Sequence, residues 1–231
     1  MVFAKQEPAT SLLFADTYYV VTDPEKAKRV SDSLRNRLSK EGFKRIYSTF
    51  LSETAQSEDL MFRFASYVFA SEKNIEEDLS NSEVWGVRKA AQITRRESHR
   101  MKAFVRFKLT KDQLYYAIIE PDCDVLPLIE NHFSSRYADQ RWLIYDAKRK
   151  YGIYYDLKKV STVELQFSSE HNSDKFLAEI CDQEEAFFQN LWVQYFTHVN
   201  IESRKNTRLH LRHMPKRYWK NLTEKVAKIK K

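Results

Sequence analysis

The sequence contains little glycine, with three glycines among 231 residues, at positions 42, 86 and 152. Neither a G-x-G-x-x-G pattern nor a G-x-x-x-x-G-K-[ST] pattern occurs. The phosphate-binding loops of Rossmann-type dinucleotide sites and of P-loop sites depend on such glycines. Both classes of nucleotide site are therefore excluded, and we predict no bound cofactor.

Cysteine and long apolar runs are also scarce. Cys123 and Cys181 are the only cysteines, and two thiols by themselves form no metal cluster, so we interpret them as free. No apolar run approaches the roughly 20 residues that a helix needs to cross a bilayer. Residues 1–8 lack the charged-then-apolar pattern of a signal peptide. We expect a cytoplasmic protein that does not associate with a membrane.

Acidic residues are scarce in two segments of the chain. The net charge is +7, but residues 88–111 hold nine Lys/Arg against one acid, Glu97, and residues 201–231 hold eleven against two acids, Glu202 and Glu224. The rest of the chain is therefore acidic. Such segregation favours a polyanionic partner, although solvated surface charge is an equally open interpretation of either segment alone.

The order of elements predicts an α+β fold. Residues 1–231 are expected to form a single domain in which an antiparallel sheet packs against N-terminal and C-terminal helices. The sheet should contain two hairpins and an extra strand, and the basic segment 200–231 should dock on the core. The expected strands are 103–109 and 114–119, then 142–145 and 153–155, then 162–167.

Local signals also predict where helices begin and end. Asp23 should cap a helix that starts at Pro24 and ends at Gly42. The change to alternating apolar residues at Ala103 should end a longer helix that starts at Ser82. Asp124 should cap the helix that follows the second strand.

Three residues are candidates for acid/base chemistry, namely Glu97, His99 and Asp122. A histidine beside a carboxylate can act as a general base. A carboxylate that directly follows a buried strand can be presented to a catalytic site at the end of that strand. The alternatives are structural: His99 would be a cation near a helix C-terminus, and Asp122 would be a turn residue. For Asp122 we favour the structural role.

The remaining polar candidates give weaker signals. His210 and His213 have a spacing that can bind a metal, but no cysteine or acid clusters with them, so we predict no metal site. Cys123 has no histidine partner in the sequence that would make it a nucleophile.

The basic segments combine cations with aromatic side chains. Lysine and arginine neutralise phosphates, and aromatic faces stack on unpaired bases. The two segments should meet on one face of the folded protein, because a single DNA groove loses its main support if they lie on opposite sides. The candidate contact residues are Arg96, Arg100, Lys102, Arg106, Arg136, Arg204, Arg208, Lys216 and Arg217.

Several motifs together resemble a known family. They include Arg96-Glu97-x-His99-Arg100-Met101-x-x-Phe104-Val105-Arg106-Phe107, Ala117-x-x-Glu120-Pro121 and Met214-Pro215-x-Arg217-Tyr218-Trp219. The chain from about Thr22 onward is similar to a domain of unknown function described for proteins of DNA metabolism or DNA repair. The family's chains begin with a further strand and helix, so residues 1–21 are expected to be a truncated N-terminal element.

The resemblance implies a DNA context but no particular reaction. Members are fused to uracil-DNA glycosylase-like domains or encoded beside a radical-SAM protein, and no catalytic residues carry over. Three hypotheses follow. The chain is an accessory module that binds DNA and works with such a partner, an enzyme that acts on damaged or modified nucleotides through Glu97, His99 and Asp122, or an adaptor that docks an acidic protein.

Overall fold

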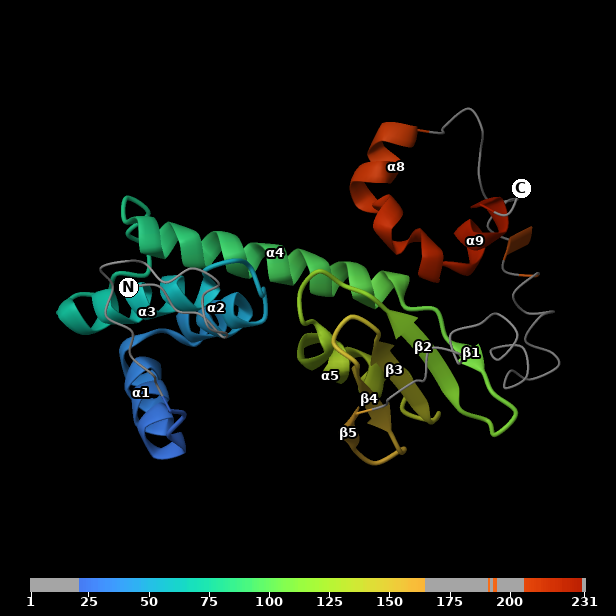
Figure 1. Ribbon diagram of the computed structural model, residues 1–231, viewed down its shortest axis with the longest axis horizontal. Coiled ribbons are helices and arrows are strands. Elements are labelled where there is room, and N and C mark those ends of the chain that lie inside the picture. Colours follow the sequence, from blue (N-terminus) through green and yellow to red (C-terminus); the bar gives the residue numbers. More distant parts are fainter. Residues whose placement is uncertain (1–20, 165–190, 192, 195–205, 230–231) are drawn as a thin grey trace, which may run out of the picture. The chain divides into compact units, whose positions relative to one another are not determined.

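The computed structural model describes residues 21–164, 191, 193–194 and 206–229 (Figure 1). It divides the chain into two compact units, residues 1–95 and 96–231. The organisation of residues 1–231 as one domain stays a prediction. Residues 1–20 of the expected truncated N-terminal element, the expected strand residues 165–167 and Arg204 lie outside the described residues.

The first unit is helical. It contains α1 (Pro24–Arg37), α2 (Lys40–Phe50), α3 (Ser57–Ala70) and the beginning of α4 (Ser82–Phe104). Apolar residues at helical spacing turn inward and form one buried cluster. Its buried members are Leu34, Leu38, Phe64, Val68, Ile75, Val84 and Val87.

The predicted end of the first helix at Gly42 is wrong, although its predicted start is confirmed. The Asp23 carboxylate accepts hydrogen bonds from the N–H groups of Glu25 and Lys26 and caps α1. The helix ends at Arg37, because Ser39 starts a new one by accepting the Gly42 N–H at 2.9 Å. Glu76 supports this cap by accepting from the Ser39 N–H at 2.6 Å and from its hydroxyl at 2.7 Å.

The helix α4 also extends further than the sequence pattern predicted. It continues to Phe104, and the first strand, β1, comprises only Lys108–Leu109. The Val105 N–H still donates to the Met101 carbonyl at 3.1 Å, as in a helix. Both side chains are buried, so burial at helical spacing outweighs the local alternation of apolar and polar residues.

The second unit contains a five-stranded sheet in the order β1-β2-β3-β4-β5. Its further strands are β2 (Tyr115–Ile119), β3 (Trp142–Asp146), β4 (Tyr151–Tyr155) and β5 (Val160–Glu164). The two predicted hairpins and the extra strand are present, and the α+β class is confirmed. The sheet is only mostly antiparallel, however, because β2 and β3 run parallel.

The parallel pair results from the helix between its strands. α5 (Leu126–Arg136) packs against β4 and returns the chain to the start of β3, which is the usual way to connect parallel neighbours. Asp124 does not cap this helix as predicted. The N-cap is Val125, which makes no side-chain cap bond, and Asp124 instead accepts a hydrogen bond from the Tyr151 hydroxyl.

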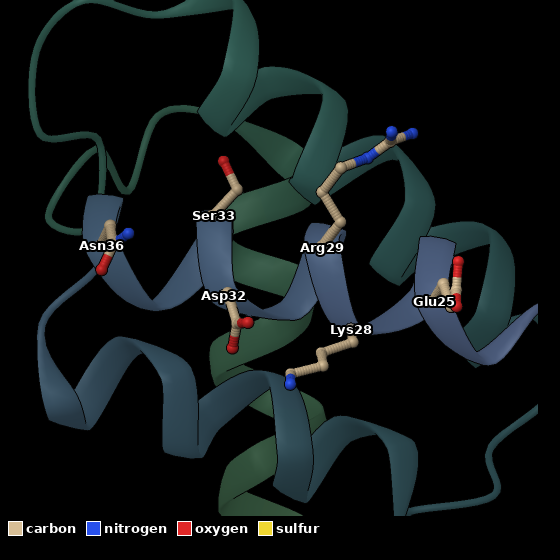
Figure 2. Close-up of a pocket in the computed structure, with 6 residues that line it drawn as sticks. All are labelled: Glu25, Lys28, Arg29, Asp32, Ser33 and Asn36. Atoms are coloured by element: carbon tan, nitrogen blue, oxygen red, sulfur yellow. The ribbon is translucent and has the colours of Figure 1, made fainter.

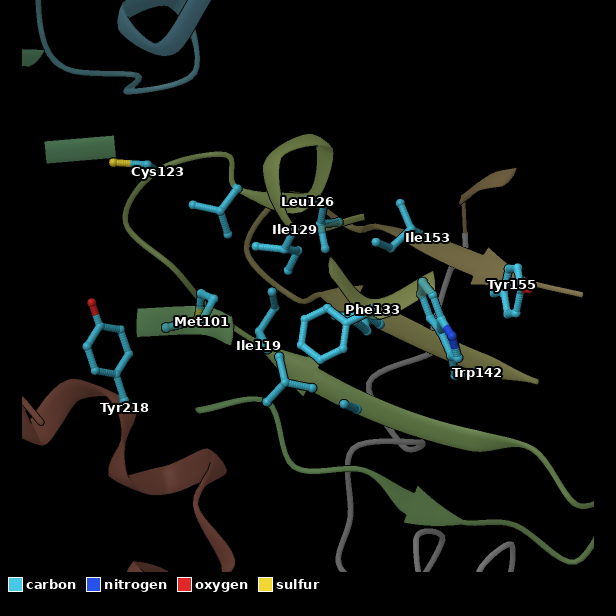
Figure 3. Close-up of a cluster of buried hydrophobic side chains, with 14 of the residues drawn as sticks. Met101, Ile119, Cys123, Leu126, Ile129, Phe133, Trp142, Ile153, Tyr155 and Tyr218 are labelled. Carbon is cyan, nitrogen blue, oxygen red and sulfur yellow. The ribbon is translucent and has the colours of Figure 1, made fainter. Parts of the chain in front are cut away.

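The core of the second unit joins the sheet, α5, the end of α4 and the C-terminal segment. That segment forms α8 (Thr207–His213), the 3-10 helix η3 (Lys216–Asn221) and α9 (Thr223–Ile229). Tyr218 and Leu222 are buried in the same cluster as Met101, Ile119 and Phe133. Figure 3 shows the Tyr218 ring extending from η3 toward this cluster.

Gly152 in β4 provides a test of the sheet geometry. A Cβ there would lie 2.8 Å from the backbone oxygen of Ile144 on the neighbouring strand. We expect Gly152→Ala to lower the free energy of unfolding by about 1–3 kcal/mol, because backbone must move to admit the methyl group. Thermal and denaturant unfolding would measure this loss.

Gly86→Ala in α4 is the matched control. Its Cβ would meet only the end of the Leu60 side chain, at 2.7 Å. Alanine adds about 1 kcal/mol of helix propensity, which offsets the displacement of that side chain. We expect a nearly neutral change. Equal losses in both variants would contradict the assigned strand register.

Candidate nucleic-acid interface

Glu97 forms the centre of a buried polar cluster in the second unit. The helical spacing that buries Thr94 and Met101 also turns Glu97 inward, and this residue is 2% exposed. Its Oε1 accepts the Asp122 N–H at 3.0 Å. Its Oε2 accepts from Arg217 Nη2 at 3.1 Å and from the Tyr218 hydroxyl at 2.5 Å. A carboxylate at this depth needs such donors to offset its lost hydration.

Tyr218 serves this cluster as a hydrogen-bond donor. Burial, and then the adjacent Glu97 carboxylate, raise the pKa of the Tyr218 hydroxyl well above its ordinary value. The hydroxyl therefore keeps its proton at neutral pH. Arg217 lies over the Tyr218 ring, 4.6 Å from its centroid, so the two donors support each other.

A second ion pair connects the same two basic segments, but here the C-terminal segment provides the acid and the segment 88–111 provides the arginine. Arg106 Nη2 binds Glu224 Oε1 at 2.8 Å, and the Glu224 side chain is fully buried. Glu97 belongs to the basic segment 88–111 and pairs with Arg217 of the C-terminal segment, whereas Glu224 belongs to the C-terminal segment and pairs with Arg106. Glu97 and Glu224 thus each bind an arginine of the other basic segment.

These contacts bring the two basic segments together in one unit. Arg217 and Glu97 are 120 residues apart in sequence. Arg100 Nη2 also donates to the Arg212 carbonyl at 3.5 Å, which places the end of α4 beside α8. Residues of the two basic segments are therefore in direct contact.

The loop after β2 completes the cluster. It lies at the carboxyl end of the parallel pair, where the turn after β3 also lies. Lys148 Nζ and Arg149 Nη2 donate to the Asp122 carbonyl at 3.0 and 2.9 Å. The Asp122 carboxylate is mostly exposed and pairs with Arg217 at 2.9 Å. Asp122 is thus held chiefly through its backbone N–H and carbonyl groups.

The structure brings together only part of the candidate acid/base set. Glu97 and Asp122 are in contact, but His99 is exposed. A spacing of two residues places His99 on the opposite side of α4 from Glu97. The three side chains therefore do not converge on one point.

The candidate nucleic-acid contacts fall into two groups. Arg100, Arg106 and Arg217 are paired with the buried acids, so they stabilise the fold as well as adding positive charge. The other described candidates are exposed. These exposed residues are Arg96, Lys102, Arg136, Arg208 and Lys216.

Two shallow hollows lie on the described surface. One covers a face of α1 and is lined by polar residues, among them Glu25, Lys28, Arg29 and Asp32 (Figure 2). Its two cations are balanced by two acids, so it offers little attraction to an ion of either sign. The second lies between the end of α4 and α5 and includes Lys102, His132 and Arg136.

Sequence reasoning missed the roles of Glu224, Lys148 and Arg149. A usable signal existed for Glu224, because an isolated acid in a strongly basic segment that folds into a core needs a cation close by. Nothing in the sequence indicated that Lys148 and Arg149 would bind the loop after β2, since that contact depends on the parallel pairing.

Two further classes of site are absent from the described residues. No group of three or more His, Cys, Asp or Glu side chains there could hold a metal ion. Within the same residues, no helix combines the length and the apolar character that a membrane crossing requires.

A family model described as a domain of unknown function, DUF4130, matches residues 55–224. The chain belongs to this family. The match extends from just before α3 to Glu224. The DUF4130 domain therefore contains both the Glu97–Arg217 pair and the Arg106–Glu224 pair. No curated protein and no solved structure matches the chain.

Glu97→Gln tests whether the cluster holds the DUF4130 domain together. The amide keeps the shape of the carboxylate but loses the charge that Arg217 binds. We expect the free energy of unfolding to fall by about 2 kcal/mol, the range for a buried hydrogen bond to a charged group. Tyr218→Phe should cost about 1 kcal/mol, and the double variant should cost less than the sum, because the two residues share one bond.

Glu120→Gln is the matched control for this experiment. Glu120 pairs with Lys220 in a largely exposed ion pair, and such pairs contribute at most about 1 kcal/mol. Denaturant unfolding of all four variants would compare them. A loss in Glu97→Gln no larger than that in Glu120→Gln would contradict the central role of Glu97.

Proposed function

We propose that the chain is an accessory module that binds nucleic acid, DNA in the first place. The supporting observation is the meeting of the two basic segments through the Glu97–Arg217 and Arg106–Glu224 pairs. Glu97 and Glu224 bind arginines within the fold, so they do not neutralise the exposed cations around them. A polyanion offers the complementary charge.

The internal pairs separate two tasks among the basic residues. Arg106 binds the buried carboxylate of Glu224, and Arg217 binds that of Glu97. Replacement of either arginine would therefore destabilise the fold. Lys102, Arg208 and Lys216 are exposed, so they are free to contact phosphates without loss of a structural bond. The proposed interface therefore depends chiefly on this exposed group.

Catalysis by Glu97, His99 and Asp122 draws less support. Glu97 is buried and accepts three hydrogen bonds, which leaves it poorly placed to take a proton from a substrate. His99 lies across α4 from it. This arrangement favours binding over an acid/base reaction, although the loop after β2 presents the exposed Asp122 carboxylate.

The proposed module acts with a DNA-modifying partner. The motif resemblance supplies this part of the proposal, since the similar proteins are fused to a uracil-DNA glycosylase-like domain or encoded beside a radical-SAM protein. The setting is the cytoplasm. Membership of the DUF4130 family is compatible with this role and assigns no reaction.

Binding should weaken steeply with salt. If four or five exposed cations contact phosphates, the slope of log affinity against log salt should be about −4. Affinity for a short DNA duplex would then fall by roughly 10²- to 10³-fold between about 50 and 200 mM salt. Fluorescence anisotropy with duplex and single-stranded oligonucleotides would measure it.

Single substitutions locate the interface. Lys216→Ala and Arg208→Ala should each reduce the salt slope by about one. Lys158→Ala and Arg29→Ala remove the same charges from exposed positions outside both basic segments and should leave the slope unchanged. Absence of binding at low salt, or binding indifferent to salt, would overturn the proposal.

The partner and the adaptor alternative are tested together. The chain should co-purify with a co-expressed radical-SAM or glycosylase-like protein and should also bind oligonucleotides alone. Co-purification without affinity for nucleic acid would favour an adaptor. Turnover of a lesion-bearing oligonucleotide that is lost in Asp122→Asn would contradict the accessory role and indicate an enzyme.

A further inference from the structure

The hollow between α4 and α5 is built almost entirely from hydrogen-bond donors. It is shallow and open, and apart from Leu128 the residues that line it are polar. Lys102 comes from the end of α4, and the others come from α5. The polar lining residues are Lys102, Asn131, His132, Ser135 and Arg136.

The periodicity of α5 explains why these side chains gather on one side. Leu128, Asn131, His132 and Ser135 follow the i, i+3, i+4, i+7 pattern of a single helix face. The face turned toward the core instead carries residues such as Ile129 and Phe133, which are buried. The hollow is therefore formed by a regular helix packed on the sheet, and not by a loop or a chain end.

No carboxylate lies among the described residues that line the hollow. The only acid of α5 is Glu130, which lies on the side of the helix away from His132 and Ser135. The charges of Lys102 and Arg136 are thus uncompensated from within the hollow. The Arg136 guanidinium lies 5.8 Å from the centroid of the Tyr137 ring, a contact that limits its freedom.

The pKa of His132 reflects its burial and the positive charges near it. The ring is partly buried and meets Phe133 edge to face, with centroids 5.1 Å apart. Burial, and then the charges of Lys102 and Arg136, hold the pKa of His132 below its usual value. An anion in the hollow would offset the last two effects and favour the imidazolium, which adds a further donor.

We propose that the hollow of Lys102, Asn131, His132, Ser135 and Arg136 is a binding site for one phosphate group. A phosphate offers several acceptor oxygens and negative charge, and the hollow offers two cations, an amide, a hydroxyl and an imidazole. As a contact for a strand's backbone phosphate, the site rests on the proposed nucleic-acid function. It would position the strand along α5 without reading its sequence.

The first experiment uses inorganic phosphate and the full chain. The imidazole signal of His132, assigned by its loss in His132→Gln, is followed by NMR at constant ionic strength. We expect a saturable shift of His132 and none of comparable size at the exposed His213 on α8. Lys102→Ala and Arg136→Ala should each weaken phosphate binding by roughly tenfold or more, Arg136→Lys should restore part of it, and Lys158→Ala should have no effect.

A pH series with sulfate gives an independent measurement, because the charge of sulfate stays constant over the range in which His132 titrates. Anion binding should raise the pKa of His132. Affinity should therefore increase as the pH falls through the range of that pKa. A shift that stays linear in anion concentration, or that survives both Lys102→Ala and Arg136→Ala, would overturn the site.

A final arm uses an oligonucleotide that carries only phosphodiester groups. If it moves the His132 signal and phosphate competes with it, the site serves the strand. If phosphate binds at His132 but no oligonucleotide binds, the site stands while the nucleic-acid function fails, and the phosphate has another source. If the oligonucleotide binds equally well to Lys102→Ala and Arg136→Ala without moving His132, the site fails and the function stands.

Discussion

The burial of Glu97 is the constraint that organises the second unit. A carboxylate that is 2% exposed would be costly to leave unpaired, and the cost of removing one partner from such a group is typically 3–5 kcal/mol. Its donors come from the loop after β2 and from η3. Three segments that are distant in sequence must therefore meet wherever Glu97 is buried.

The same constraint divides the basic residues by task. Two buried acids each bind an arginine from the other basic segment, so part of the positive charge stabilises the fold. Repulsion between the two segments is thereby offset at the points where they touch. The exposed cations that are not paired with these acids keep the positive surface charge that would attract a polyanion. The hollow beside α5, which is lined by hydrogen-bond donors, is one defined position at which such an anion would bind.

The elements with strong local signals could be predicted from the sequence. The Asp23 cap, the strands around the turn at residues 147–150 and the short strand before Glu120 agree with their local patterns. The end of α4 and the start of α2 could not be predicted in this way. Val105, directly after α4, is buried at helical spacing from Met101 despite its alternating neighbours. Ser39 starts α2 with the help of Glu76, which lies 37 residues away.

For the site, the sequence by itself determined the charge segregation, the few acids within the basic segments and the family membership. Only the tertiary structure decided which arginines pair with buried acids and which do not, because that depends on contacts across more than a hundred residues. It also separated His99 from Glu97, since helix geometry turns residues two apart to opposite sides. The parallel pairing of β2 and β3 required the docked α5, and no local pattern encodes that long-range contact.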